Sequence, residues 1–168
     1  MHIDESAPIT ASGSVDVAAS PLDVWGVITD FGRWPSWNPD VSEAELQGPL
    51  EAGTTFRWNA GPGTITSVLR SVDQPRELGW TGTTMGVHAV HVWRLEPTET
   101  GTRVTTEESW RGWPARLMHK RMERTLRHAI VTGLHNLKTE AELNSRVAVH
   151  RLAQQRLSQP GLPLNDAA

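Results

Sequence analysis

Two side chains in the middle of the chain, His91 and Glu108, are of the types that move protons in enzymes. Their pKa values respond strongly to burial and to each other. Between them lies the turn-like segment Thr98-Glu99-Thr100-Gly101, with residues typical of β-strands on both sides. A hairpin that turns at this segment would place His91 directly opposite Glu108.

The same hairpin register pairs Trp93 with Thr106 and, two residues nearer the turn, Leu95 with Val104. Alternate residues of a strand share a face, so His91 would lie beside Trp93, and Glu108 beside Trp110. A slip of one residue would reverse the facing of one strand against the other. Opposed Cβ atoms lie about 5 Å apart, which allows an imidazole to reach a carboxylate. The sequence therefore predicts one His-carboxylate pair on the inner face of a sheet.

This pair has two interpretations. It could act as a general acid and base on a bound molecule. Alternatively, it could be a buried pair that satisfies itself and only fixes the hairpin, because perturbed pairs are also common outside active sites. Burial opposes the charged forms and mutual attraction favours them, so the sequence gives no direction for the pKa shifts. Both interpretations stay open at this point.

Other kinds of catalytic or metal site have little support. The chain has no cysteine, which removes thiolate nucleophiles and Cys-based zinc sites. Ser67 and Ser109 have no identifiable histidine partner. His128 and His135 are seven residues apart, which is not the i, i+4 spacing of a helical metal pair. We therefore expect no metal and no cofactor.

The composition indicates one globular domain. The chain has 168 residues, of which 38% are hydrophobic and 21% charged. Its net charge is −3, and no Lys/Arg cluster alternates with aromatic residues, so we expect no nucleic-acid partner. Apolar runs are far shorter than the ~20 residues that span a bilayer, so we expect no membrane insertion. The first residues lack the basic start and apolar core of a signal peptide, which predicts a cytoplasmic protein.

A sheet must position these side chains. Segments with the alternation of strands are separated by short turns, which indicates antiparallel neighbours. The expected strands cover residues 9–17, 41–46, 54–59, 64–72, 77–83, 87–96 and 102–110.

Three helical segments are expected around this sheet. Ser20-Pro21-Leu22-Asp23 has the order of a helix start, with Ser at the N-cap and Pro at the first helical position. Residues 33–39, RWPSWNP, read as a second, broken helical turn. After Pro114 a helix over 115–141 would be ~40 Å long. Its apolar face is predicted to carry Met118, Met122, Leu126, Ala129, Gly133 and Leu137.

This order of elements predicts an α+β domain. About seven antiparallel strands would curve around one long C-terminal helix, with two short helices between the first two strands. A helix laid in a curved sheet leaves a gap at its ends, which Trp34 and Trp37 could wall. We expect a flexible N-terminus at residues 1–8, the folded domain at 9–143, and an extension at 144–168 that is helical at first and then disordered.

These elements, with the segments ASPLDVW (19–25), DFGRWPSWNP (30–39), VDQPREL (72–78) and GTRVT (101–105), resemble the polyketide cyclase/dehydrase-like branch of the START/Bet v1 (SRPBCC) superfamily. The resemblance covers residues 9–143. It implies a helix-grip fold with a deep cavity between the sheet and the long helix. Members include aromatic polyketide cyclases, carriers of lipids and hormones, and chaperone-activating domains. They share no catalytic motif, so no residue role is carried over.

The candidate site therefore comes from the face pattern of the strands. We take His91 and Glu108 as catalytic candidates. The expected ligand-binding residues are the aromatic and methionine side chains that would line the cavity: Trp34, Trp37, Phe56, Trp58, Trp80, Trp93, Trp110, Met118 and Met122.

Three functions remain open. The first is binding of a hydrophobic, aromatic or polyketide-like molecule, with its cyclisation or dehydration by acid-base catalysis as the most specific form. The second is non-catalytic carriage of a lipid or another hydrophobic ligand. The third is a protein-interaction or chaperone-activating domain. A homodimer could also form through the C-terminal extension, which carries Leu143, Val147, Leu152 and Leu157.

Overall fold

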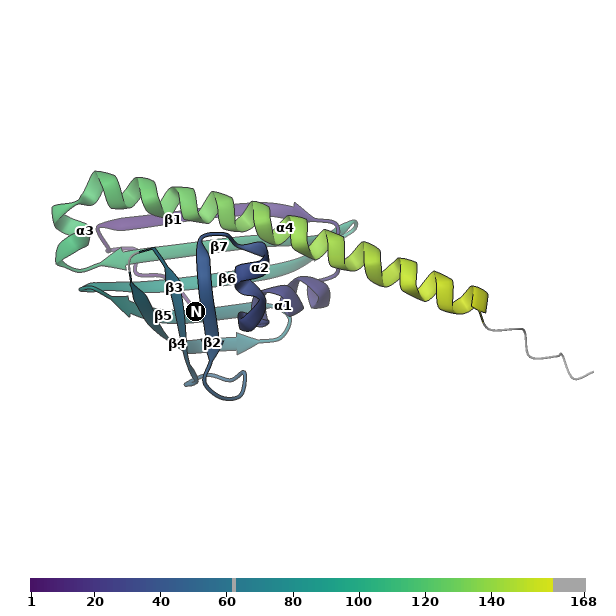
Figure 1. Ribbon diagram of the computed structural model, residues 1–168. Coiled ribbons are helices and arrows are strands. Elements are labelled where there is room, and N and C mark those ends of the chain that lie inside the picture. The colour runs from purple at the N-terminus through teal and green to yellow at the C-terminus, as the bar shows by residue number, and fades with distance from the viewer. Residues whose placement is uncertain (62, 159–168) are drawn as a thin grey trace, which may run out of the picture.

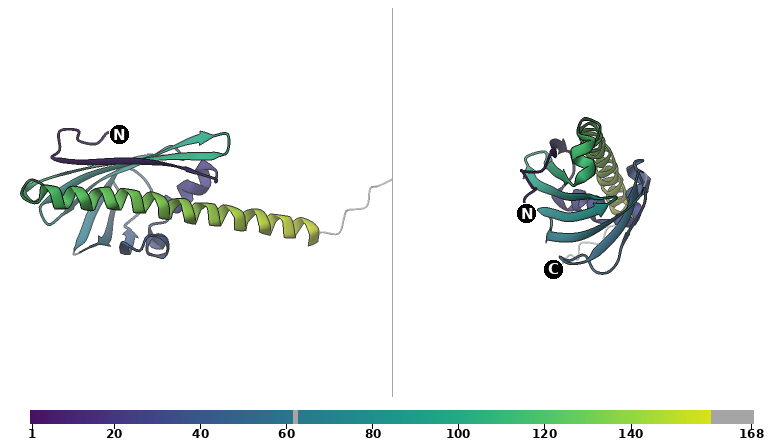
Figure 2. Two further views of the ribbon diagram at one scale, coloured as in Figure 1. Left: turned by 90° about the horizontal axis from the view of Figure 1, so that it is seen from above. Right: turned by 90° about the vertical axis from the view of Figure 1, so that its left-hand side faces the viewer.

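The computed structural model describes residues 1–61 and 63–158, and its core is one antiparallel sheet (Figure 1). The spatial order of its seven strands is β1-β7-β6-β5-β4-β3-β2. The sheet curves around a long helix that runs along its inner face, as the two views of Figure 2 show. The α+β helix-grip fold is thus confirmed. The strands are β1 (Ile9–Val17), β2 (Val41–Leu46), β3 (Thr55–Ala60), β4 (Thr64–Asp73), β5 (Glu77–Thr84), β6 (Val87–Thr98) and β7 (Gly101–Arg111).

Short helices connect β1 to β2, as the sequence predicts. Helix α1 (Pro21–Thr29) begins with a capping box in which the Ser20 and Asp23 side chains bind each other's backbone N–H groups. The RWPSWNP segment forms the 3₁₀ turn η1 (Phe31–Arg33) and the four-residue helix α2 (Trp34–Trp37). Trp34 anchors this turn, because its indole N–H donates to the Ile28 carbonyl at 2.9 Å.

The C-terminal helical region is longer than expected and is broken near its start. A short helix, α3 (Trp113–Leu117), precedes α4 (His119–Ser158). With 40 residues, α4 is about 60 Å long. It lies close to β1 at Gly13, where an added Cβ would be 2.8 Å from Leu134 Cδ1. No helix in the described part of the chain is long and apolar enough to cross a bilayer.

The predicted apolar face of α4 was partly wrong. Ala129 is exposed and Gly133 only half-buried, whereas Leu126 and Leu137 are buried as expected. The larger apolar side chains Ile130 and Leu134 turn inward instead, because they bury more area against the sheet. The buried stripe consists of Leu126, Ile130, Leu134, Leu137 and Ala141.

The N-terminal residues contact the sheet, and the C-terminal helix extends beyond it. Residues 1–8, for which we expected flexibility, lie against the sheet: the Met1 ammonium is 2.6 Å from Glu77 Oε1, and the Asp4 N–H donates to Ser109 Oγ. At the other end, α4 runs on beyond the sheet (Figure 1), with Leu143 and Val147 exposed. The side chains of Leu152 and Leu157, and the expected disordered end at 159–168, lie outside the described residues.

The aromatic core predicts a clear contrast in stability. Phe56 is fully buried, with ring centroids 4.7 Å from Phe31 and 5.5 Å from Trp80. We expect Phe56→Ala to lower the free energy of unfolding by about 3–5 kcal/mol. The exposed Leu22 is the control, and Leu22→Ala should change it by no more than about 0.5 kcal/mol. Denaturant unfolding measures both values, and similar losses for the two variants would contradict the packing described.

The projecting part of α4 predicts tolerance of truncation. A chain that ends after Arg146 keeps every buried residue of the helix, including Ala141. Its thermal midpoint should therefore stay within a few degrees of that of the full chain, since little apolar area is lost. A chain that ends after Leu137 loses Ala141 and the contacts of Glu140 and Glu142, and should unfold at a clearly lower temperature. Equal losses in both chains would place the domain boundary further along the helix.

Candidate functional site

The hairpin of β6 and β7 builds the centre of the site. His91 stands opposite Glu108, and Trp93 opposite Thr106, as predicted from the turn and the alternation. On the other side of β6, His91 stands opposite Trp80 of β5. All five side chains belong to the inner face, so the register alone brings an imidazole, a carboxyl and two indoles together.

His91 is held through one ring nitrogen. Its Nε2 lies 2.7 Å from Thr106 Oγ1, and the Thr106 hydroxyl in turn donates to the Val92 carbonyl at 3.2 Å. Because that hydroxyl proton is directed to Val92, the hydroxyl oxygen accepts a hydrogen bond from the His91 Nε2–H group. This arrangement leaves His91 Nδ1 without a proton.

The Nδ1 atom faces Glu108. Glu108 Oε2 lies 3.2 Å away, yet outside the direction of an aligned hydrogen bond, so Nδ1 is a buried polar atom without an aligned partner among the described residues. The other carboxyl oxygen, Oε1, accepts the Trp110 indole N–H at 2.6 Å. A buried nitrogen without an aligned hydrogen-bond partner is uncommon in folded proteins.

Burial sets the charge of both groups. Desolvation raises the pKa of Glu108 to about 7, while the hydrogen bond from Trp110 acts in the opposite direction. Desolvation also lowers the pKa of His91 to about 3. Mildly acidic solution therefore leaves an uncharged carboxylic acid beside an uncharged imidazole. The sequence left this direction open, and the structure favours the neutral pair over the ion pair.

The expected aromatic lining is largely one cluster of rings in mutual contact. Neighbouring centroids lie between 4.5 Å, for Trp80 with His91, and 6.0 Å, for Trp34 with Trp80. Trp80 and Trp93 contact the His91 ring directly, and Trp80 continues the contacts to Phe56, Trp34 and Trp58. All of these except Trp58 are almost fully buried, so they pack as part of the hydrophobic core and do not line an open cavity.

The inner face is more open near α3. There Trp58, Ala89 and Trp110 are only half-buried, although they point toward the interior. Ser67, Gly82 and Ala89 pair in one row across three strands, and their side chains are small. Trp110 stands opposite Ala89 at one end of this row, and the Trp58 indole donates to Ser67 at the other end. Glu108 and His91 stand in the next row.

Sequence reasoning missed Gly82 in this row. An isolated glycine within a strand pattern indicates a close approach or a bulge, and that signal could have identified it. An added Cβ at Gly82 would lie 2.9 Å from Ser67 Oγ, the atom that accepts the Trp58 indole N–H at 3.1 Å.

The two methionines lie at the margin of this region. Met122 is half-buried and packs against the core, whereas Met118 ends α3 with 42% of its surface exposed. Met118 is therefore not part of the interior. In the described residues, no three His, Asp or Glu side chains gather in a way that could hold a metal ion.

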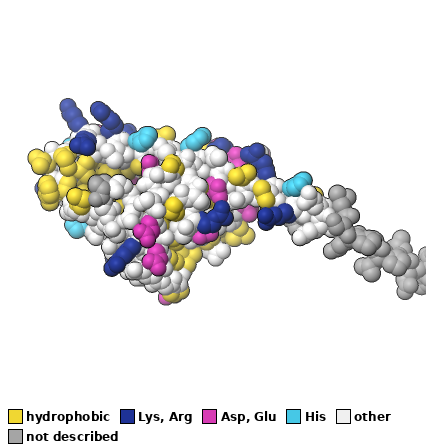
Figure 3. Space-filling model, in the orientation of Figure 1, with side chains coloured by type: hydrophobic (Ala, Val, Ile, Leu, Met, Phe, Trp, Pro, Cys, Tyr) yellow, Lys and Arg dark blue, Asp and Glu magenta, His cyan; other side chains and the backbone are white. Residues whose placement is uncertain are grey.

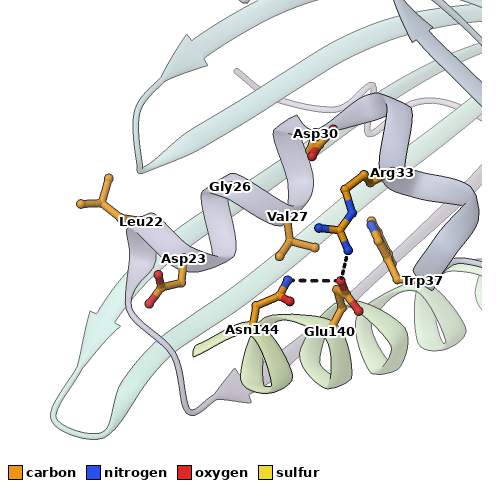
Figure 4. A pocket seen from close by; sticks show the side chains of 9 residues that line it. All are labelled: Leu22, Asp23, Gly26, Val27, Asp30, Arg33, Trp37, Glu140 and Asn144. Carbon is orange, nitrogen blue, oxygen red and sulfur yellow. Dashed lines mark hydrogen bonds and ion pairs between the residues drawn. The ribbon is translucent and has the colours of Figure 1, made fainter. Parts of the chain in front are cut away.

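Trp37 lies in a different place, a groove of about 270 Å³ between α1, α2 and α4 (Figure 4). Glu140 of α4 accepts hydrogen bonds from Arg33 and Asn144, both at 3.2 Å. The Trp37 indole nitrogen is buried without a partner among the described residues. The groove is polar, since Asp23 and Asp30 also line it, and it lies toward the other end of the sheet from α3 (Figure 1).

The neutral carboxyl predicts a pH dependence of stability. The pKa of Glu108 rises from 4.5 to about 7 on folding, so the folded chain retains a proton that the unfolded chain releases between these values. The stability that this proton provides is present below about pH 4.5 and is lost as pH rises through about 7. Relative to Glu108→Gln, the wild-type free energy of unfolding should fall between about pH 5 and about pH 8.

Denaturant unfolding of both proteins at each pH measures this difference, and the titration of His91 is common to both. A relative stability that is constant or rises with pH would mean that Glu108 is ionised in the folded chain.

Solved structures share this fold at low sequence identity. An aromatase/cyclase from Streptomyces sp. R1128 is 18% identical, with a TM-score of 0.71, and the match covers 84% of this chain and 94% of that one. A hypothetical protein from Helicobacter pylori is 16% identical, with a TM-score of 0.73 and coverage of 82% and 90%. A START superfamily protein from Mycobacterium smegmatis is 14% identical, with a TM-score of 0.62 and coverage of 77% and 97%. No curated protein sequence is similar to the chain.

Family membership follows from the sequence itself. Residues 8–142 match the family described as polyketide cyclase / dehydrase and lipid transport. The match includes the strands that carry His91 and Glu108 and ends within α4. The chain therefore belongs to the polyketide cyclase / dehydrase and lipid transport family.

Proposed function

We propose that the chain binds a flat hydrophobic molecule, aromatic or polyketide-like, in the interior near α3, with a carbonyl or hydroxyl group of that molecule at Glu108 and His91. The observation that carries this proposal is the pair itself. The Glu108 carboxyl, whose pKa is raised by burial to about 7, and the His91 Nδ1 atom, which has no aligned partner among the described residues, are both buried. The carboxyl also accepts the indole N–H of the half-buried Trp110.

The chemistry of the surroundings favours an uncharged, flat ligand. Trp110, opposite Ala89, and Trp58, which donates to Ser67, offer large apolar faces beside the small residues Ser67, Gly82 and Ala89. An anionic ligand would bring a charge next to a buried carboxyl, which costs free energy without a compensating cation. A carbonyl oxygen, by contrast, could accept the Glu108 proton, and a hydroxyl could donate to His91 Nδ1.

The same geometry can support acid-base catalysis of a cyclisation. His91 Nδ1 would take a proton from the carbon next to one carbonyl, and that carbon would form a bond to a second carbonyl carbon. The oxygen of the second carbonyl would take the proton of Glu108 and become a hydroxyl. The imidazolium and carboxylate that result lie 3.2 Å apart, so return of the proton from His91 to Glu108 would restore the neutral pair.

Loss of water would follow by the same groups. Glu108 would protonate the new hydroxyl as it leaves, and His91 would accept a second proton from the neighbouring carbon, which leaves a carbon–carbon double bond. This part of the proposal needs a substrate that carries two carbonyl groups.

Carriage without chemistry is the second candidate, because an apolar interior with one polar pair also suits a transported ligand. The two differ in their dependence on the proton of Glu108. A carrier would tolerate an amide at this position with only a modest loss of affinity, whereas a catalyst would lose turnover and keep binding.

Fluorescence titration tests the site directly, since tryptophans surround it. Flat aromatic polyketides and flavonoids should quench the emission in a saturable manner, and fatty acids much less. Glu108→Gln, which removes the acidic proton but keeps an N–H donor for a ligand carbonyl, should weaken binding only about twofold to threefold, whereas His91→Ala should weaken it by about tenfold.

Two exposed residues of the same strand provide matched controls. His88→Ala and Glu96→Gln alter the same residue types at solvent-exposed positions of β6 and should leave the titration unchanged. If no aromatic compound perturbs the fluorescence, or if the controls weaken binding as much as the site variants, the proposed site is wrong. Product formation from a diketone substrate, lost in Glu108→Gln while binding persists, separates catalysis from carriage.

A further inference from the structure

Large apolar side chains are exposed together at the α3 end of the molecule. Met85 is 70% exposed, Trp113 66%, Leu117 76% and Met118 42%. Figure 3 shows hydrophobic side chains gathered at this end of the surface. We call these four residues the α3 patch. Exposed apolar residues are common singly, but a contiguous group of this size marks a surface that contacts something.

The patch is built from two separate segments. Trp113 begins α3, and its indole lies against Gly86, where an added Cβ would be 3.1 Å from the ring atom Cδ1. Gly86 and Met85 form the turn between β5 and β6, with φ angles of 81° and 46°. The turn thus presents the Met85 side chain beside the first turn of α3.

Met85 has a backbone conformation that is unfavourable for methionine. Both central residues of this turn have positive φ, a conformation for which Asn, Asp or Gly is strongly preferred. A long apolar side chain here costs conformational energy and leaves its surface in water. Backbone outliers of this kind are typical of functional positions, which is a second and independent sign that the patch is used.

Basic side chains surround the patch. Arg116, Lys120, Arg121 and Arg124 are all exposed on α3 and the first turns of α4. The acidic residue in this stretch, Glu123, pairs with Arg127 at 2.9 Å. The whole chain carries a net charge of −3, whereas the surface around the α3 patch carries an excess of positive charge. Its partner should therefore be anionic as well as apolar.

We propose that the α3 patch docks the protein on the surface of a bilayer that contains anionic lipids. The apolar residues protrude from a hairpin tip and a helix corner, and a protruding group can enter the interfacial region of a bilayer without a shaped partner. Basic side chains around it would contact lipid headgroups. An acidic protein would need a surface complementary to this convex shape, which makes it the less favoured occupant.

The α3 patch lies near the residues of the proposed ligand site. Trp110 ends the inner face of β7 only three residues before Trp113, and it is one of the half-buried residues beside Glu108. A bilayer at the α3 patch would therefore lie next to the more open end of the interior. The docking itself rests on the exposed residues and charges alone, and it stands whether or not the proposed ligand is correct.

Vesicle co-sedimentation tests the proposal with the full chain. We expect association with vesicles of phosphatidylcholine and phosphatidylglycerol, much less with phosphatidylcholine alone, and release at high salt. Leu117→Gln and Met85→Asn should each weaken association severalfold. Met85→Asn suits the turn, so a normal thermal midpoint is expected for it. Lys120→Gln should weaken association about fivefold, the value of one surface charge near an anionic membrane.

Matched controls lie away from the patch. Val131→Gln changes an equally exposed apolar residue of α4, and Arg57→Gln an exposed basic residue of β3; neither should alter association. Absence of association with the anionic vesicles, or equal association of wild type, Met85→Asn and Leu117→Gln, would overturn the proposal. Retention on an acidic protein-like polymer without vesicle binding would assign the patch to a protein partner instead and would equally contradict it.

Discussion

The antiparallel register of β6 and β7 decides which side chains meet in the interior of this protein. It puts His91 and Glu108 opposite each other on the inner face, and on the outer face it brings Arg94 diagonally across from Glu107. The two pairs differ in charge state. Arg94 and Glu107 keep partial contact with water and form an ion pair, whereas burial makes the inner pair neutral, with raised Glu108 and lowered His91 pKa values. A slip of one residue that reversed the facing of β6 would turn Arg94 inward and bury a guanidinium, so the apolar core and the charges select the same register.

The interior is not uniform along the sheet. Its middle is filled by aromatic rings in contact, with Phe56 and Trp34 buried at the centre. One end has the polar groove with Trp37, and the other has the row of small residues next to Glu108. The aromatic rings packed against His91 hold it in place beside Glu108. The small residues Ser67, Gly82 and Ala89 in the next row cover the neighbouring inner face less than large side chains would. The same end carries the exposed apolar and basic residues of α3, so binding and docking would be neighbours in space.

The sequence predicted what depends on local signals. The turn Thr98–Gly101 and the strand alternation fixed the hairpin and the opposition of His91 and Glu108, and Ser20 and Pro21 marked the start of α1. It failed where distant packing decides. Small residues such as Ala129 carry little information about which helix face is buried, and Met118 proved exposed because α3 and α4 meet there. The neutral state of Glu108 also depends on elements remote in sequence that remove water from it. Which residues touch a ligand stays a prediction.

The protonation state of Glu108 is the central physical claim, and carbon-13 NMR of the glutamate carboxyl groups tests it most directly. Comparison with Glu108→Gln identifies the resonance, because that signal alone disappears. The account predicts a carboxyl that is protonated in mildly acidic solution, where other glutamates are ionised, and that titrates near pH 7. A Glu108 resonance that is already ionised at about pH 5 would contradict the neutral pair. The acid-base proposal, which starts from the proton on Glu108, would then be wrong as well.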